Sequence, residues 1–326
     1  MKQQRRHLVA ALAAGLCLPW ATAQAQAYPT KPLRIVVPFG AGGVADLTAR
    51  AVGEKLGSQL GQPVVIENKP GAGGVSAGET VARAAPDGYT LLLMSNGTAV
   101  SEGMFKSLPF EARKDFAPIS LLGTFDIGIV VPQNSKYQNL GELLAAAKAT
   151  PGKLNVATIA IGSTQNLAAE LFKTTAGVDV QVVPFNGTPA VINALRGGQV
   201  EAAVEILAPL KGQFAGKTLR TLATLGDERP FDMKDVPTAA ETGGALKGFD
   251  VASWNALAAP KGTPKEVIDK LNAELQKALT SPDLKKKLAD QGVVAKHSTP
   301  DQLAKLLDSE IKRWSGVIER AKIPRQ

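Results

Sequence analysis

Short apolar runs rich in β-branched residues alternate with amphipathic segments along most of this chain of 326 residues. Such runs are typical of buried strands when turn residues flank them. The runs cover residues 33–39, 63–68, 89–95, 127–132, 154–159, 180–185 and 219–225. The helical segments between them cover residues 46–60, 140–149, 165–175 and 189–196. Because helices that connect strands cover the faces of a parallel sheet, the alternation predicts an α/β protein with parallel strands.

The pattern changes after Pro260, where only helical segments follow. Each of them begins with Ser or Thr beside Pro, which is a typical helix start. The segments cover residues 263–281, 281–292 and 299–321. We expect this helical end of the chain to pack on its first half.

Two apolar runs are long enough to cross between two halves of the molecule, at residues 117–132 and 249–259. They predict the hinge of a clamshell. The expected organisation is a first lobe made of residues 28–125 and 251–326, with a second lobe at residues 126–250 between them.

The amino-terminal end has the three-part layout of a secretory signal peptide. Three basic residues precede an uncharged stretch that ends in the small-residue run ATAQAQA. Its apolar part, LVAALAAGLCL, is about half of the roughly 20 residues that a membrane-spanning helix needs. We therefore expect residues 1–27 to be a cleavable signal peptide. Two A-x-A sites allow cleavage before Gln26 or before Tyr28, and we favour Tyr28.

This leader predicts export to the periplasm. Arg5-Arg6 leaves the twin-arginine route open beside the general Sec route. Cys17 follows Leu16, whereas lipoprotein signals place a small residue there, so we expect no lipid anchor.

Removal of the leader changes the chemistry that remains. The whole chain has 37 basic and 29 acidic residues, one Cys and two His, and the leader takes away three basic residues, the Cys and one His. The mature chain then has no thiol for a disulfide or a nucleophile. Its mild positive charge suits weak attraction of anions and forms no basic block of the kind that binds nucleic acid. With one His and no calcium-spaced loop, we expect neither a metal site nor a cofactor.

The segment GAGGVAD at residues 40–46 lies between a predicted strand and a predicted helix. Glycines there let backbone N–H groups approach a ligand, and the helix start carries a partial positive charge. The segment also fits G-x-G-x-x-A, with Glu67 at the end of the next strand, as in dinucleotide sites. Pro38-Phe39 between strand and glycines is unusual for such a site, so anion binding is the preferred interpretation.

GVSAG at residues 74–78 fits the G-x-S-x-G elbow of serine hydrolases, and His297 follows in the expected chain order. The elbow needs its serine directly after a strand. Here the loop KPGAGG separates the strand from Ser76. A hydrolase that uses Ser76 and His297 is therefore the less favoured alternative.

AIGSTQN at residues 160–166 is a second candidate for anion binding, since hydroxyls and N–H groups at a helix start can hold a carboxylate. Ordinary helix capping explains the same residues without a ligand. A weak repeat relates VVPFGAGG at 36–43 to VVPFNGTP at 182–189. Two facing turns and chance similarity both account for it.

Several segments together closely resemble the Bug, or TctC-type, receptors of tripartite tricarboxylate transporters. They are YPTKPLRIVVPFGAGGVADLTAR, QLGQPVVIENKPGAGG, APDGYTLLL, KDFAPISLLG, DVPTAAETG, PKGTPKEVIDKLNAEL and TPDQLAKLLDSEIKRW. The resemblance covers nearly all of the mature chain. It implies a two-lobed periplasmic binding protein, type II-like, which closes on its ligand as a flytrap and has mixed βα sheets in each lobe.

The resemblance also implies how a small organic anion, a mono- or dicarboxylate, is held. In the family two loops bind the carboxylate, and they match residues 39–46 and 160–166. The ligand-binding residues expected here are Phe39, Gly42, Gly43, Asp46, Ser95, Asn96, Gly97, Gly162, Ser163, Thr164, Asn166, Asn186 and Glu205. Neither loop contains an arginine, so helix starts, hydroxyls and N–H groups are expected to hold the anion.

Finally, the resemblance implies that a monomeric receptor without catalytic residues delivers this anion to the membrane permease subunits of the transporter. A sensor of the same fold that acts on a signalling partner is the alternative. The chain departs from the family at Ala160, where glycine is common, at Asn166, where histidine is common, and at Phe185-Asn186, where Lys or Tyr is common. These departures leave the identity of the carboxylate open.

Overall fold

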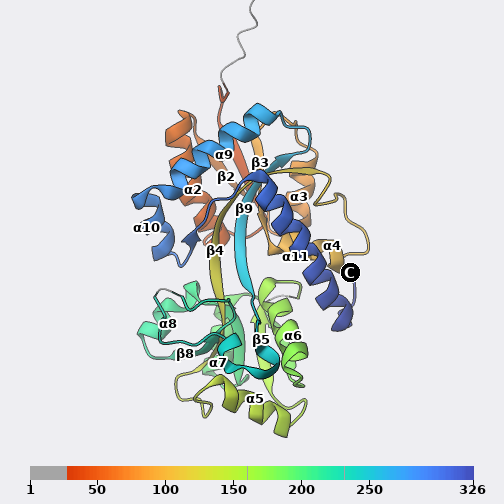
Figure 1. Cartoon of the computed structure of the whole chain (residues 1–326), viewed down its shortest axis with the longest axis vertical. Helices are drawn as coiled ribbons and strands as arrows, with labels where there is room; N and C mark the ends of the chain where they lie inside the picture. The colour runs from red at the N-terminus through yellow and green to blue at the C-terminus, as the bar shows by residue number, and fades with distance from the viewer. Residues whose placement is uncertain (1–27, 160, 231) are drawn as a thin grey trace, which may run out of the picture.

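The computed structural model describes residues 28–159, 161–230 and 232–326, so the predicted signal peptide lies outside the described residues. Helices and strands form two groups, one above the other in Figure 1. The long strands β4 (Phe116–Pro132) and β9 (Ala252–Pro260) run between these groups.

The upper group in Figure 1 contains the first sheet, with the strand order β2-β1-β3-β9-β4. Its other strands are β1 (Leu33–Val37), β2 (Val64–Asn68), β3 (Thr90–Ser95) and the short β10 (Val294–Ala295). β1 is parallel to β2 and β3, as predicted, whereas β9 runs antiparallel to β3 and β4. The first sheet is therefore mixed, which confirms the mixed βα sheets that the family resemblance implied. β10 also interrupts the carboxyl-terminal region that we expected to be purely helical.

Helices cover both faces of the first sheet. One face carries α2 (Val44–Leu60), α9 (Lys265–Thr280) and α10 (Pro282–Asp290), and the other carries α3 (Val75–Ala82), α4 (Asn96–Met104) and α11 (Pro300–Arg320). Leu91 and Leu93 of β3 pack with the first set, and Leu92 and Met94 pack with the second, because successive strand side chains alternate between the faces. The carboxyl-terminal helices thus pack on the first half of the chain, as predicted.

The lower group contains the second sheet, in which β4 pairs with β7 and β8, and β5 lies between β7 and β6. Its strands are β5 (Asn155–Ile159), β6 (Gln181–Phe185), β7 (Ala202–Ile206) and β8 (Leu219–Thr224). Its helices are α5 (Leu140–Ala149), α6 (Thr164–Ala176), α7 (Thr188–Arg196) and α8 (Lys211–Ala215). Short 3₁₀ turns complete the fold as η1 (Ala72–Gly74), η2 (Ala208–Leu210), η3 (Ala240–Thr242) and η4 (Gly244–Leu246).

β4 belongs to both sheets. Residues 116–126 pair with β9, and residues 127–132 pair with β7 and β8. The largest hydrophobic cluster accordingly contains both Val36 of the first sheet and Val204 of the second. Lys211 of α8 also connects the two groups of elements. Its Nζ lies 3.0 Å from Asp232 Oδ2 and donates to the carbonyl of Ala289 in α10.

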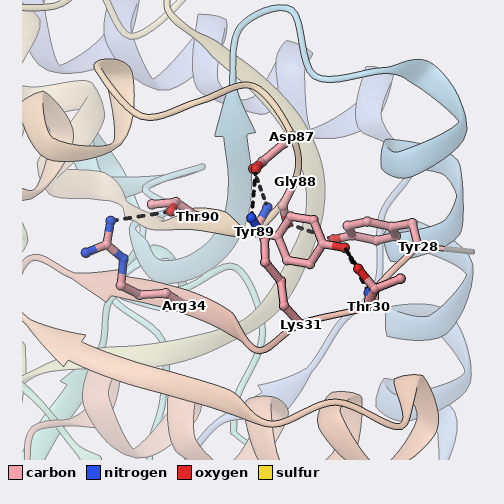
Figure 2. A network of polar contacts seen from close by, with 8 residues as sticks. All are labelled: Tyr28, Thr30, Lys31, Arg34, Asp87, Gly88, Tyr89 and Thr90. Carbon is pink, nitrogen blue, oxygen red and sulfur yellow. Dashed lines mark hydrogen bonds and ion pairs between the residues drawn. The ribbon is translucent and has the colours of Figure 1, made fainter. Parts of the chain in front are cut away.

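The first described residues are bound to the first sheet (Figure 2). The hydroxyl of Tyr28 donates to the carbonyl of Gly88 at 2.7 Å, and its ring lies edge-on to Tyr89, 5.1 Å between centroids. The N–H of Thr30 donates to the Tyr89 hydroxyl at 2.9 Å, while the Tyr89 N–H donates to Asp87. Burial raises the pKa of Tyr28. The chain is thus held firmly from Tyr28 onward.

Candidate functional site

Loop 1, residues 39–46, connects β1 to α2. Gly42 has a φ of +83°, which favours glycine over residues with a side chain. In this conformation the Gly42 N–H donates to Asp46 Oδ2 at 2.8 Å. The glycine and the residue four positions later therefore close the loop on itself.

Asp46 is 2% exposed, and its carboxylate is used within the protein. Arg50 donates from Nε at 3.0 Å and Asn68 donates from Nδ2 at 2.9 Å. Although burial acts to raise the pKa of Asp46, the hydrogen bonds from Arg50, Gly42 and Asn68 lower it below its ordinary value. Asp46 is thus an ionised brace of loop 1.

The start of α2 carries no side-chain cap. Its N-cap residue is Gly43, which has no side chain to accept a first-turn N–H. The first N–H groups of a helix lack carbonyl partners within that helix, and an anion can satisfy them. Loop 1 therefore presents backbone donors at a partly positive helix end.

Loop 2, residues 161–166, connects β5 to α6 and repeats the construction of loop 1. Gly162 has a φ of +80°, and its N–H donates to Asn166 Oδ1 at 3.2 Å. Asn166 Nδ2 donates to the hydroxyl of Thr158 at 3.3 Å. Ser163 caps α6, since its Oγ accepts the Asn166 N–H at 3.1 Å.

Glu205 lies at the end of β7 and is completely buried. Its Oε1 accepts from Gln165 Nε2 at 2.7 Å and from the N–H of Ile206 at 2.8 Å. Burial raises the pKa of Glu205, although the hydrogen bonds from Gln165, Ile206 and Thr188 oppose this rise. Because Gln165 lies in the first turn of α6, its hydrogen bond to Glu205 connects the end of loop 2 to β7.

The turn after β3 starts α4 with a capping box. Ser95 Oγ accepts the Gly97 N–H at 3.1 Å, and the hydroxyl of Thr98 interacts with the Ser95 N–H. Asn96 is completely buried and its Nδ2 points toward Glu310 Oε2, 3.4 Å away. Asn96 therefore lies in the interior, beside the carboxyl group of Glu310 in α11.

Helix α4 adjoins both loops. A Cβ on Gly97, at its start, would lie 4.0 Å from Phe39 Cζ of loop 1. A Cβ on Gly162 of loop 2 would lie 3.3 Å from Cε of Met104, the last residue of α4. A helix of nine residues rises about 12 Å. Of the predicted site residues, loop 1 and the turn at Gly97 therefore lie at the start of α4, and loop 2 lies at its end.

The turn after β6 differs from these two loops. Gly187 has a φ of +89°, but its N–H donates to the carbonyl of Phe185, and not to a side chain four residues later. Asn186 is exposed. The turns in the sequence repeat of 36–43 and 182–189 thus differ in their hydrogen bonds. The loop that has the same glycine-to-side-chain hydrogen bond as loop 1 is loop 2.

Ser76 and His297 are not brought together. Ser76 is exposed in α3, which packs on one face of the first sheet. His297 lies beside Asn272 of α9, which covers the opposite face. The Ser–His pair of a hydrolase is therefore absent from this arrangement of the described residues.

Two further features of the described ranges bear on function. Within them, no group of three or more His, Cys, Asp and Glu could hold a metal ion. Nor does any helix described there have the length and apolar character to cross a membrane.

Sequence reasoning did not identify the residues that brace the two loops. They are Arg50, Asn68, Thr158 and Gln165. The spacing of four between Asp46 and Arg50 on a helix is a readable signal, because such residues are neighbours on the helix surface. Thr158 lies eight residues before Asn166, on the strand that leads into loop 2. The contacts of Asn68 with Asp46 and of Gln165 with Glu205 join residues 22 and 40 positions apart and carry no local signal.

The family model described as "Tripartite tricarboxylate transporter family receptor" matches residues 48–323 of this chain. The curated protein BugT of Bordetella pertussis (strain Tohama I) is 37% identical over 308 residues, which cover 94% of this chain and 93% of BugT.

Two solved structures have similar folds. MatC from Rhodopseudomonas palustris with bound malate has a TM-score of 0.78 and 34% identity, covering 89% of this chain and 100% of MatC. An R. palustris protein solved with adipate has a TM-score of 0.81 and 30% identity, covering 90% of this chain and 98% of that protein.

The two-lobed α/β fold is that of a periplasmic binding protein. The family model that matches residues 48–323 identifies the family of binding proteins. The chain belongs to the family of tripartite tricarboxylate transporter receptors. It is a solute-binding receptor and not an enzyme. The family and its structural neighbours imply a periplasmic location.

Proposed function

We propose that loop 1 and loop 2 together bind the carboxylate of a small organic anion. The observation that carries this proposal is the shared construction of the loops. Each one places a positive-φ glycine two residues before a helix and binds the glycine N–H to a side chain in the first turn of that helix. The malate and adipate in the two neighbouring structures support a carboxylate as the ligand.

The donors that we assign to the anion differ between the loops. Loop 1 contributes the uncapped first-turn N–H groups of α2, behind Gly43. Loop 2 contributes the hydroxyls of Ser163 and Thr164. Each helix end is worth about 0.3–1 kcal/mol toward an anion, so affinity depends on several donors and on closure of the two lobes around the ligand.

We further propose that the lobes consist of residues 28–125 with 251–326, and of residues 126–250. The change of β4 from β9 to β7 and β8 as its partner, after Asp126, supports this division. Bending of β4 and β9 near this position would then open and close the site.

The partners proposed for this receptor are the membrane permease subunits of a tripartite tricarboxylate transporter, which a monomer of the receptor would supply with the anion. Residues 1–27 are proposed as the signal peptide, cleaved before Tyr28. The bonds of Tyr28 to Gly88 and Tyr89 support cleavage no later than Tyr28, a condition that cleavage before Gln26 also meets.

A thermal-shift experiment on residues 28–326 tests the carboxylate proposal. The panel contains mono- and dicarboxylates, their neutral amides, sugars and metal cations. A ligand present at one hundred times its Kd stabilises the folded state by about 2.7 kcal/mol. We expect carboxylates to raise Tm and their amides to leave it unchanged. A shift by sugars or cations alone would refute the proposal.

A glycine variant localises the binding. Gly43→Val has room for its side chain, since a Cβ there would meet only the Gly40 carbonyl at 3.8 Å, but it covers the start of α2. We expect it to abolish the carboxylate shift while Tm of the free protein changes little. The matched control is Gly212→Val in α8, where a Cβ meets nothing within 4 Å. Equal binding by both variants would move the site away from loop 1.

A further inference from the structure

The two groups of elements also touch beside the strands that connect them. Helices α4 and α10 cover opposite faces of the first sheet, and each lies near an element of the second group. On the α4 side, loop 2 approaches Met104. On the α10 side, η2 and α8 approach the turn that follows α10. In Figure 1, α10 and α8 lie to the left of β4 and β9, and α4 and α6 lie to the right.

The contact on the α10 side, which we call the back contact, involves Ala208 and Lys211 of the second group with Ala289 and Gly292 of the first. Lys211 Nζ donates to the carbonyl of Ala289 at 3.3 Å, in the last turn of α10, where a helix carries a partial negative charge. Asp232 Oδ2 lies 3.0 Å from the same ammonium group and orients it. A Cβ on Gly292 would overlap the Cβ of Ala208 and lie 3.1 Å from its Cα. The turn after α10 therefore meets η2 almost backbone to backbone.

The back contact lies next to the position at which β4 changes its partner. Asp126, which pairs with β9 at this position, lines the same small cavity as Ala208, Lys211 and Gly292. Bending of β4 near Asp126 would therefore move the two sides of the back contact relative to each other.

The contact on the α4 side is softer. There a Cβ on Gly162 would meet only the side chain of Met104, at 3.3 Å from its Cε. A methionine side chain has three rotatable bonds and can yield. The backbone of Gly292 against Ala208 leaves no side chain that could move away. Approach of the two groups is thus blocked on the α10 side and possible on the α4 side.

Two paired strands bend most easily out of their own plane. Such bending brings the groups together on one face of the sheet and separates them on the other. Bending toward α4 moves loop 2 closer to that helix, but it has to break the hydrogen bond from Lys211 to Ala289 and separate Ala208 from Gly292.

We infer that the back contact opposes closure of the second lobe on α4 and thereby sets the affinity of the receptor for its ligand. This inference rests on the proposed function, since it takes closure at loop 2 as the step that completes the binding site. A contact that favours the open form lowers the measured affinity in proportion to the fraction of molecules that remain able to close. Weakening the back contact should therefore tighten binding, although it lies outside both ligand loops.

Two variants weaken the back contact in different ways. Lys211→Met keeps a long side chain but loses the hydrogen-bond donor, and Ala208→Leu pushes η2 away from Gly292. In calorimetric titrations of residues 28–326 with malate and with adipate, we expect tighter binding by roughly threefold for Lys211→Met and roughly fivefold for Ala208→Leu. The matched controls are Lys148→Met and Ala149→Leu, at exposed positions at the end of α5. They should leave the affinity unchanged.

A distance measurement on the ligand-free protein tests closure without any ligand. Residues 28–326 contain no cysteine, so spin labels can be attached at Ser309→Cys in α11 and Thr174→Cys in α6, both exposed and on the α4 side. Electron–electron double resonance then gives the distribution of distances between the two lobes. We expect Lys211→Met and Ala208→Leu to shift it to shorter distances, and the two α5 controls to leave it in place.

The two measurements separate this inference from the proposed function. Unchanged or longer label distances in both back-contact variants would overturn the inference, whatever the affinities are. Weaker binding by both variants would overturn it as well, and so would controls that act like the variants. If the natural chain binds no carboxylate at all, the proposed function fails, while the label distances still decide whether the back contact opposes closure.

Discussion

Loop 1 and loop 2 make the same hydrogen bond with different side chains. In both, the N–H of a positive-φ glycine donates to the residue four positions later, Asp46 in loop 1 and Asn166 in loop 2. The carboxylate of Asp46 is balanced by Arg50, whereas the amide of Asn166 interacts with the neutral Thr158. An oxygen acceptor at that position is thus sufficient for the loop conformation. Where the acceptor is a carboxylate, a cation lies beside it, and where it is a neutral amide, its partner is neutral.

The helix starts differ in a second respect. The hydroxyl oxygen of Ser163 already accepts an N–H of α6 as its cap, whereas Gly43 has no side chain and leaves α2 uncapped. The free backbone donors are therefore concentrated at loop 1. This difference predicts that exchanging features between the loops has unequal effects on stability and binding.

The largest expected effect comes from giving loop 2 the acid of loop 1. Asn166→Asp places a carboxylate at a 5% exposed position, and no described residue supplies it with a cation. We expect a loss of about 2 kcal/mol in the free energy of unfolding near neutral pH. Burial without a cationic partner is expected to raise the pKa of the introduced carboxyl, so the loss should shrink as the pH falls toward about 4. Urea unfolding at both pH values measures it.

The reverse exchange, Asp46→Asn, should be milder. The amide oxygen can still accept the Gly42 N–H, while the ionic interaction with Arg50 is lost, which costs about 1 kcal/mol at neutral pH. The lowered pKa of Asp46 means that its contribution is complete above its ordinary pKa and is lost as the pH falls through the folded value. The variant and the natural protein should therefore become equally stable in acid. A greater loss for Asp46→Asn than for Asn166→Asp would contradict the comparison.

The smallest expected change in stability comes from Gly43→Ser, which gives α2 the cap that α6 already has. The φ of −79° at Gly43 allows a side chain, and the cap should add about 0.3 kcal/mol to stability. Binding of a carboxylate should nevertheless weaken by roughly fivefold, because the hydroxyl occupies a donor worth up to about 1 kcal/mol to the anion. Ser163→Ala is the converse control and should cost about 1 kcal/mol. Tighter binding by Gly43→Ser would remove loop 1 as the main anion contact.

Local sequence patterns predicted many of the helices and strands but not which strands pair or in which direction. The helix expected at 140–149 is α5, and every predicted apolar run lies in or overlaps a strand. Strand β7 was missed because AAVEI is short and contains the acidic Glu205, which is buried with hydrogen bonds from Gln165 and from the N–H of Ile206. Helix α4 was missed because NGTAVSEGM contains two glycines and two hydroxyl residues, which are poorer helix formers than alanine or leucine. The antiparallel direction of β9 depends on residues far away in the chain.

The glycine turns of the site could be read from the sequence because a special backbone conformation demands that residue type. The role of Asp46 could not. Its second partner, Asn68, lies 22 residues further along the chain and reaches it through the pairing of β1 with β2. Similarly, only the structure shows that Asn96 turns toward Glu310 and away from solvent.

The passage of β4 through both sheets also constrains how this protein can change by mutation of its gene. Since strand side chains alternate between faces, loss of one codon near Asp126 would force the residues on one side of the deletion to exchange their buried and outward faces. A surface loop can change in length without altering the elements beside it. In β4 the same change would turn buried side chains outward along one of the two sheets. The pairing is irregular between Pro118 and Ser120, between Leu121 and Gly123, and between Ile129 and Val130, where the strand already tolerates uneven spacing. Insertions that survive selection in this strand are therefore expected at those three positions.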